Sequence, residues 1–190
     1  MLDGILFSYE THPRDLGESA IYQVESLLKN LGKIIPNHEK AILIPRPGGV
    51  NGLILLDLRE CLRYVDVNEK ITIRKNLVEF LVEAFDKGDL LSIVKIRIID
   101  FIVPLDIDKL VDVTRFLADR IRGTWKIELR TRKMADRMEI IRKVASVVDQ
   151  PVDLKNPKFV LNIEILSRDL VVVYLVDKER EEETIIRPKY

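Results

Sequence analysis

The stretch from residue 151 to residue 176 constrains the fold more than any other part of this 190-residue chain. It opens with a polar turn ending in Asn156-Pro157, where the proline fixes its own φ and pushes Asn156 into an extended conformation. Residues 159–166 then alternate with period two, a short turn follows, and residues 170–176 form an apolar run rich in β-branched side chains. This pattern predicts a β hairpin whose second strand is buried on both faces, with a basic, amide-bearing turn beside it.

The residues before this turn predict three further elements. Apolar side chains recur at helical spacing over 107–121 and over 135–148, and Asp106 or Asp108 is placed to cap the first of these helices. Between them, residues 124–132 alternate strictly between apolar and charged side chains, which is typical of a half-buried strand. We therefore expect one unit over residues 105–176 with the order helix, strand, helix, turn, hairpin.

The N-terminal part predicts a second unit, residues 1–104. Strands are expected at 4–9, 41–44, 53–58 and 91–103, with amphipathic helices at 16–31 and 74–85 and a possible short helix at 59–67. The order strand, helix, strand, strand, helix, strand is that of the ferredoxin-like arrangement, so the fold class is α+β (mixed α/β). The charged tail, residues 177–190, is expected to be extended or loosely ordered.

Composition limits the functional classes. The formal net charge is zero, which excludes a uniformly basic nucleic-acid binder but not a local basic face. The N-terminus lacks the pattern of a signal peptide, the apolar runs are far shorter than the roughly 20 residues of a membrane span, and the single cysteine excludes a disulfide framework. We expect a cytoplasmic protein with no membrane partner.

Charge is nevertheless unevenly distributed. Residues 115–143 hold ten basic side chains against four acidic ones. Such cations would neutralise RNA phosphates, and Asn156 could hydrogen-bond a base edge or a ribose 2′-hydroxyl, which distinguishes RNA from DNA. The predicted RNA-binding residues come from the basic strand, the start of the helix after it, and the polar turn: Lys126, Arg130, Arg132, Lys133, Arg137, Lys155, Asn156 and Lys158. Two plainer interpretations stay open: the charges merely solvate a strand face and pair with Glu128, Glu139 and Asp136, and Asp153 only caps the turn.

Other candidate sites are weaker. The glycine-rich residues 47–52 lack the Lys-Ser/Thr of a phosphate-binding loop and are expected to turn the chain between two strands. The two histidines and Cys61 lack ligand spacing, so we expect no metal and no cofactor. Trp125 and Phe159 could stack on bases, but their register among aliphatic residues favours the core.

The sequence Val152-Asp-Leu-Lys-Asn-Pro157 running into Phe159-Val-Leu-Asn-Ile-Glu-Ile165 resembles the THUMP domain, an RNA-binding module of tRNA-modifying enzymes. The resemblance covers roughly residues 105–176 and implies a preceding ferredoxin-like domain, in agreement with the order predicted independently for residues 1–104. Within the family, the chain looks most like the stand-alone adaptors of tRNA acetylation. The sequence ends fourteen residues after Val176, so we expect no catalytic domain of its own.

The resemblance implies a non-catalytic adaptor that binds tRNA near its acceptor end and presents it to a separate enzyme. By the same resemblance, that enzyme would be a tRNA cytidine acetyltransferase making N4-acetylcytidine. The alternatives are a scaffold whose long strands and apolar hairpin mediate oligomerisation, with incidental RNA binding, and an enzyme with an unrecognised site.

Overall fold

The computed structural model describes residues 1–12, 16–131 and 136–188, which form two compact units. Unit 1 consists of residues 1–99 together with 182–190, and unit 2 consists of residues 100–181. These limits differ from the predicted 1–104, 105–176 and 177–190. No helix within the described ranges is long and apolar enough to cross a membrane.

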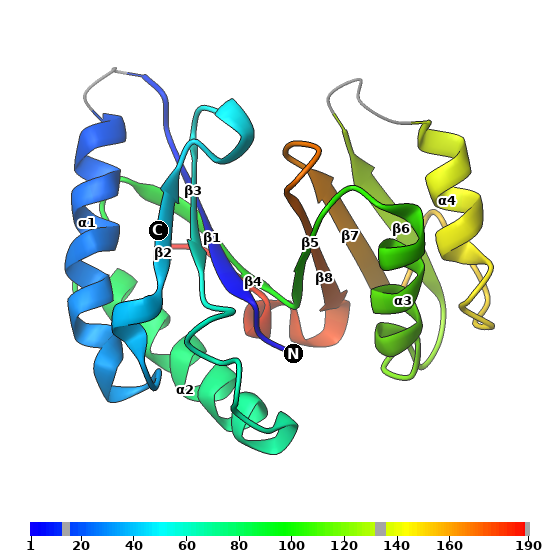
Figure 1. The fold of residues 1–190 in the computed structure, drawn as a ribbon, viewed down its shortest axis with the longest axis horizontal. Coiled ribbons are helices and arrows are strands. Elements are labelled where there is room, and N and C mark those ends of the chain that lie inside the picture. The colour runs from blue at the N-terminus through cyan, green and yellow to red at the C-terminus, as the bar shows by residue number, and fades with distance from the viewer. Residues whose placement is uncertain (13–15, 132–135, 189–190) are drawn as a thin grey trace. The chain divides into compact units, whose positions relative to one another are not determined.

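Unit 1 has the predicted element order (Figure 1). Its elements are β1 (Gly4–Tyr9), α1 (Leu16–Asn30), β2 (Ile42–Pro45), β3 (Leu53–Asp57), α2 (Val67–Asp86), β4 (Ile93–Ile99) and β9 (Ile185–Ile186), with short 3-10 turns at Leu31–Lys33, His38–Lys40 and Pro47–Gly49. The strands lie in the order β2-β3-β1-β4-β9 and every neighbouring pair is antiparallel. The order of the first four matches the ferredoxin-like arrangement.

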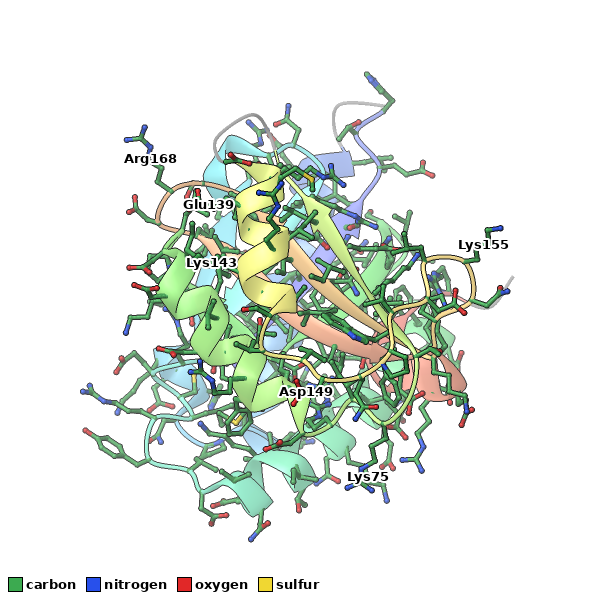
Figure 2. All side chains as sticks on the ribbon, turned by 90° about the vertical axis from the view of Figure 1, so that its right-hand side faces the viewer. Lys75, Glu139, Lys143, Asp149, Lys155 and Arg168 are labelled. Atoms are coloured by element: carbon green, nitrogen blue, oxygen red, sulfur yellow. The ribbon has the colours of Figure 1, made fainter. Side chains whose placement is uncertain are left out.

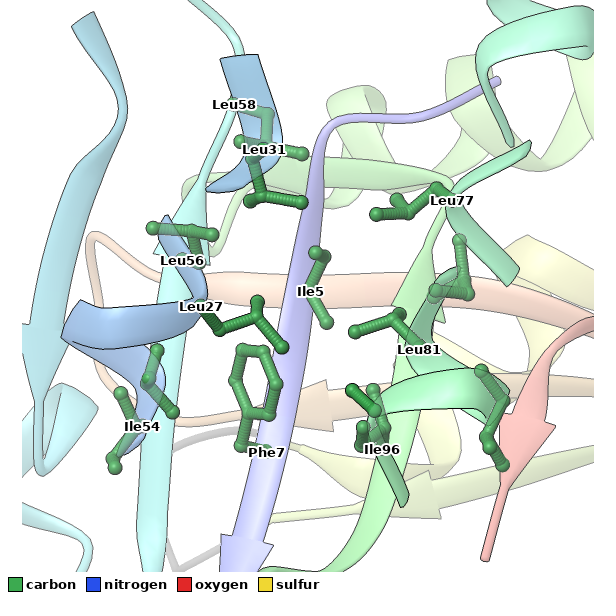
Figure 3. Close-up of a cluster of buried hydrophobic side chains, with 14 of the residues drawn as sticks. Ile5, Phe7, Leu27, Leu31, Ile54, Leu56, Leu58, Leu77, Leu81 and Ile96 are labelled. Carbon is green, nitrogen blue, oxygen red and sulfur yellow. The ribbon is translucent and has the colours of Figure 1, made fainter. Parts of the chain in front are cut away.

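One hydrophobic core holds unit 1 together. Side chains of β1 and β4, such as Phe7 and Ile96, are fully buried against Leu27 of α1 and Leu81 of α2 (Figure 3). Both helices therefore cover the same face of the sheet. Each fully buried aliphatic side chain of this kind contributes about 1.5–3 kcal/mol through burial of apolar surface.

Unit 2 is a smaller sheet with two helices. Its elements are β5 (Phe101–Val103), α3 (Ile107–Ala118), β6 (Trp125–Arg130), α4 (Arg137–Ala145), β7 (Phe159–Ile165), β8 (Val171–Asp177) and the 3-10 segment Lys178–Glu183, of which the last two residues belong to unit 1. The strand order is β5-β8-β7-β6; β7 and β8 form the predicted hairpin, and β6 runs parallel to β7. Aspartate side chains cap both helices, Asp106 for α3 and Asp136 for α4. Val171, Val173 and Leu175 of β8 are buried in the core of unit 2.

The predicted strand 91–103 is two strands in two sheets. Asp100 separates them: its side chain is fully buried, its Oδ1 lies 3.0 Å from Nη1 of Arg120, and its Oδ2 accepts a hydrogen bond of 2.9 Å from the Leu175 backbone N–H. A buried carboxylate is costly unless it is paired and hydrogen-bonded. Here Arg120, just after α3, and the backbone of Leu175 in β8 supply these interactions. The alternation of apolar residues over 91–103 did not predict the break between β4 and β5.

Two other elements differ from the expectations. Helix α2 begins at Val67 and not at residue 74, because Asp66 caps it by accepting from the backbone N–H groups of Asn68 and Glu69. The tail, expected to be extended or loosely ordered, is ordered over its described part and extended only at Ile185–Ile186: Ile186 is buried, and the Thr184 carbonyl accepts from Ile98 N–H at 2.9 Å. The tail therefore adds strand β9 to the sheet of unit 1.

Candidate nucleic-acid interface

The turn before β7 is held rigid by an aspartate. Oδ1 of Asp153 accepts hydrogen bonds from the backbone N–H groups of Lys155 at 2.9 Å and of Asn156 at 3.0 Å. The same two bonds, Asn156 first, lower the pKa of the Asp153 carboxyl, because they stabilise its charged form. Asp153 is thus a cap within the turn, as one of the two sequence interpretations proposed.

Backbone hydrogen bonds anchor the turn to the start of β6. Trp125 N–H donates to the Pro151 carbonyl at 3.0 Å, and Asp153 N–H donates to the Trp125 carbonyl at 3.0 Å. Lys158 N–H donates to the carbonyl of Thr124 at 2.9 Å, and the indole Nε1–H of Trp125 donates to the Gln150 carbonyl at 2.8 Å. A ligand that contacts the turn therefore meets a preorganised surface.

The side chains of the turn point into solvent. Lys155, Asn156 and Lys158 are all exposed, and Lys155 projects from the turn in Figure 2. Lys155 has no acidic partner among the described residues, whereas Nζ of Lys158 lies 3.7 Å from Oε1 of Glu179, with both side chains mostly exposed. An exposed ion pair at that distance contributes little, so both lysines are free to neutralise phosphate.

The stem of Lys158 crosses a glycine. Gly123 adopts φ +141°, and a Cβ at this position would lie 3.2 Å from Cδ of Lys158. The exposed Arg122 precedes this glycine and has no acidic partner among the described residues. Arg122 was counted with the basic residues but not assigned to the site; its position next to Gly123 brings it to the end of unit 2 where Lys158 lies.

The charges of β6 are offset by neighbouring acids. Nζ of Lys126 lies 2.8 Å from Oε1 of Glu128, and Arg130 lies 3.9 Å from Glu128 and 3.7 Å from Glu164. Hydrogen bonding to Lys126 is the largest cause of the lowered pKa of Glu128. On this face the plainer interpretation, charges that pair with each other, describes Lys126 and Arg130 well.

The parallel register separates the predicted residues into two groups. Trp125 pairs with Phe159 and Arg130 with Glu164, so Lys158 lies at the beginning of the β6–β7 pair and Arg130 at its far end. Five residues of strand span about 17 Å. Arg137 begins α4 beyond that far end, while Arg132 and Lys133 lie outside the described residues. The structure therefore brings Lys155, Asn156 and Lys158 together and leaves Arg130 and Arg137 elsewhere.

Trp125, Phe159 and the glycine-rich residues 47–52 have structural roles, as the sequence favoured. Trp125 is 1% exposed and packs in the core of unit 2, with Phe159 partly buried beside that core. The glycine-rich residues turn the chain between β2 and β3. Among the described residues no cluster of His, Cys, Asp or Glu side chains could hold a metal ion.

Unit 2 is thus a compact mixed α/β module that displays a rigid, cation-bearing turn at one end of its sheet. Residues 107–176 match the THUMP domain family, so this chain contains a THUMP domain. A comparison with curated proteins finds no match.

Solved structures share the fold across both units. The PH1313 protein of Pyrococcus horikoshii Ot3 matches 93% of this chain with a TM-score of 0.62 and 16% identity, over 55% of its own length. A 4-thiouridine synthetase, solved as an RNA complex with bound ATP, matches 93% of this chain with a TM-score of 0.57 and 16% identity, over 42% of its own length. The chain spans about half of the length of these proteins.

Proposed function

We propose that the chain is a non-catalytic tRNA-binding adaptor that presents tRNA to a separate modifying enzyme. In this proposal, the turn of residues 153–158 contacts the RNA. The observation that carries the proposal is the rigid, exposed turn with Lys155, Asn156 and Lys158, set in a THUMP domain. Two cations and an amide on a preorganised loop suit phosphate and base-edge contacts. Arg122 at the same end adds a guanidinium, which binds phosphate in a bidentate manner.

The catalytic step belongs, in this proposal, to another protein. In this proposal, the exposed lysines and the amide of the turn bind and orient the RNA. The similar fold of a 4-thiouridine synthetase solved with RNA supports a place in tRNA modification. The resemblance to the stand-alone adaptors suggests a tRNA cytidine acetyltransferase as the partner and N4-acetylcytidine as the product.

The site is tested by reversing the charge of the turn. The double variant Lys155→Glu with Lys158→Glu should bind tRNA at least about tenfold more weakly than the wild type, because two phosphate contacts become repulsive. Fluorescence anisotropy with labelled tRNA measures the dissociation constant, and circular dichroism checks the fold.

The matched control makes the same change of charge at the other end of unit 2. Lys109 and Arg168 are exposed, and the Leu105 N–H that donates to the Arg168 carbonyl places the β7–β8 turn beside the start of α3. Figure 2 shows Arg168 well away from Lys155. Lys109→Glu with Arg168→Glu should leave the affinity within about twofold. If both double variants lost the same amount of tRNA affinity, the loss would reflect the overall charge of the protein, and the proposed site would be wrong.

The adaptor role has its own readout. Wild-type chain incubated with tRNA and acetyl donor should leave the nucleosides unchanged by mass spectrometry, and the purified acetyltransferase should acetylate tRNA faster when the chain is added. Modified nucleosides formed by the chain alone would overturn the adaptor role and leave tRNA binding intact.

A further inference from the structure

Unit 1 has a cavity between its two helices, which cover the same face of the sheet (Figure 1). The cavity has a volume of about 390 Å³, and it is lined by residues of α1, of α2 and of the short turns in which these helices end. This volume lies within the range of roughly 300–1,000 Å³ that is usual for small-molecule sites. All of the lining residues belong to unit 1, so the cavity is separate from the turn of residues 153–158.

Hydrogen bonds tie one wall of the cavity to the segment after α2. The side-chain amide of Gln23, a lining residue, donates to the hydroxyl groups of Ser19 at 3.3 Å and of Ser92 at 3.2 Å. Oε1 of Gln23 accepts from the Ser92 backbone N–H at 3.0 Å. These bonds connect α1 to the chain that leaves α2, so a ligand meets walls that are already in position.

The C-terminal end of α2 is closed by a glycine in the left-handed region. Gly88 has φ +78°, and its N–H donates to the Phe85 carbonyl at 3.0 Å, while the Asp89 N–H donates to the Ala84 carbonyl at 2.9 Å. This pair of bonds is the Schellman motif. It fixes the backbone of Lys87 and Asp89, two charged residues that line the cavity.

Aromatic and aliphatic side chains supply the apolar part of the lining. Tyr22 has 71% of its surface exposed although it lines the cavity, and Phe80 is partly buried. The buried Leu27 and Ala84 add further apolar surface. Exposed aromatic rings beside a cavity favour a ligand with a flat ring system, such as a nucleobase.

Two ammonium groups line the same cavity. Lys33 is exposed and has no acidic partner among the described residues. Nζ of Lys87 lies 2.6 Å from Oε1 of Glu83, but both side chains are mostly exposed, and such a pair contributes little. Asp89 is the one acidic side chain in the described lining. Two cations against one carboxylate favour an anionic ligand, and lysine binds phosphate as a point charge.

Neutral polar groups complete the lining. Nδ2 of Asn30 donates to the Ser26 carbonyl at 3.3 Å, and this bond leaves Oδ1 of Asn30 as an acceptor. The Ser26 hydroxyl also lines the cavity. A ribose hydroxyl or the polar edge of a base can bond to such groups.

We propose that this cavity of unit 1 binds a nucleotide, with its base against Tyr22 or Phe80 and its phosphate at the lysines. A nucleotide uses every part of the lining, because its phosphate meets the ammonium groups, its base meets the rings, and its ribose meets the amide and the hydroxyl. An apolar ligand would leave the ammonium groups unused, and an inorganic anion would leave the rings unused. The same chemistry is found in a free nucleotide and in an unpaired nucleotide of an RNA.

NMR titration with adenosine 5′-monophosphate tests the site. The backbone amide shifts of Tyr22, Asn30 and Lys33 should move on addition of this nucleotide. The nucleotide should bind at least about fivefold more tightly than adenosine or inorganic phosphate alone, because only the nucleotide combines stacking with a charge contact. Absence of binding, or an affinity no higher than that of inorganic phosphate, would overturn the proposal.

Two variants with matched controls locate the ligand. Tyr22→Ala and Lys33→Gln should each weaken binding of the nucleotide at least about fivefold. Tyr64→Ala and Lys75→Gln remove an exposed tyrosine and an exposed lysine of the same unit that do not line the cavity, and they should change the affinity by less than about twofold. Circular dichroism checks that each variant is folded. An affinity that survives both cavity substitutions, or that falls equally in the controls, would overturn the site.

A single-stranded tetra-adenylate distinguishes the two sources of the nucleotide. If the cavity takes an unpaired nucleotide of an RNA, the oligonucleotide should bind at least about tenfold more tightly than the mononucleotide, and Lys33→Gln should weaken its binding. If the cavity takes a free nucleotide, the oligonucleotide should bind no more tightly than the mononucleotide. Both results support a nucleotide site and assign its source. Because the titrations follow residues of unit 1, a failure of the turn in unit 2 to bind tRNA would leave them unchanged.

Discussion

At the scale of single residues, Asp153 decides the shape of the candidate interface. Its carboxylate accepts from two successive backbone N–H groups of the turn, and these bonds lower its pKa. The carboxylate form therefore supports the turn above the ordinary aspartate pKa of about 3.9 and keeps supporting it somewhat below that value. The support is lost only as the pH falls through the lowered pKa of the folded state.

This linkage predicts a titration that NMR can follow. The amide proton shifts of Lys155 and Asn156 should change together on acidification, with a midpoint below the ordinary aspartate value, because both N–H groups bond to one carboxylate. Asp153→Ala should abolish this titration and weaken tRNA binding without lowering the melting temperature of unit 1. A midpoint at or above the ordinary value would contradict the hydrogen-bonded turn.

At the scale of elements, the pairing of β6 with β7 sorts the basic residues by what surrounds them. Arg130 is 3.7 Å from the buried Glu164, a residue of the neighbouring strand, and is also near Glu128. Lys155 has no such partner among the described residues. Arg130 and Lys155 carry the same charge, but only Arg130 has acidic neighbours that offset it.

Single neutralisations should expose this difference. Arg130→Gln should change tRNA affinity by less than about twofold, because its charge is already offset by two acids. Lys155→Gln should weaken binding by about three- to tenfold, because it removes an unpaired cation from the preorganised turn. Anisotropy titrations of the two variants side by side measure the contrast. A larger loss for Arg130→Gln would place the RNA on the strand face.

The sequence predicted much at this scale because local patterns determine it. Alternation identified β6 and β7, an apolar run rich in β-branched residues identified β8, and helical spacing identified α1, α3 and α4. What the sequence could not predict depends on distant partners. The direction in which β6 pairs with β7 separates Lys158 from Arg130, and the Asp100 bonds to Arg120 and Leu175 divide one apolar run into two strands.

The start of α2 illustrates a different limit. A helix prediction that follows buried residues begins late, because Val67 and Ile71 do not face the core. Only the capping bonds of Asp66 reveal the true first turn.

At the scale of the whole molecule, zero net charge makes RNA binding depend on a few local contacts. There is no overall positive field to attract RNA, so the salt dependence of binding should count those contacts directly. Each neutralised phosphate contributes a slope of about −0.7 to −0.9 to a plot of log affinity against log salt concentration. With Arg122, Lys155 and Lys158 in contact, the slope should be about −2 to −3.

The charge-reversed turn then gives the sharpest comparison. Lys155→Glu with Lys158→Glu should reduce the magnitude of this slope by about 1.5, because two counterion-releasing contacts are removed. The control pair, Lys109→Glu with Arg168→Glu, should keep the wild-type slope. A double variant of the turn that loses affinity while keeping the full slope would mean that the lysines hold the turn in shape and that the phosphates are bound by other cations of the chain.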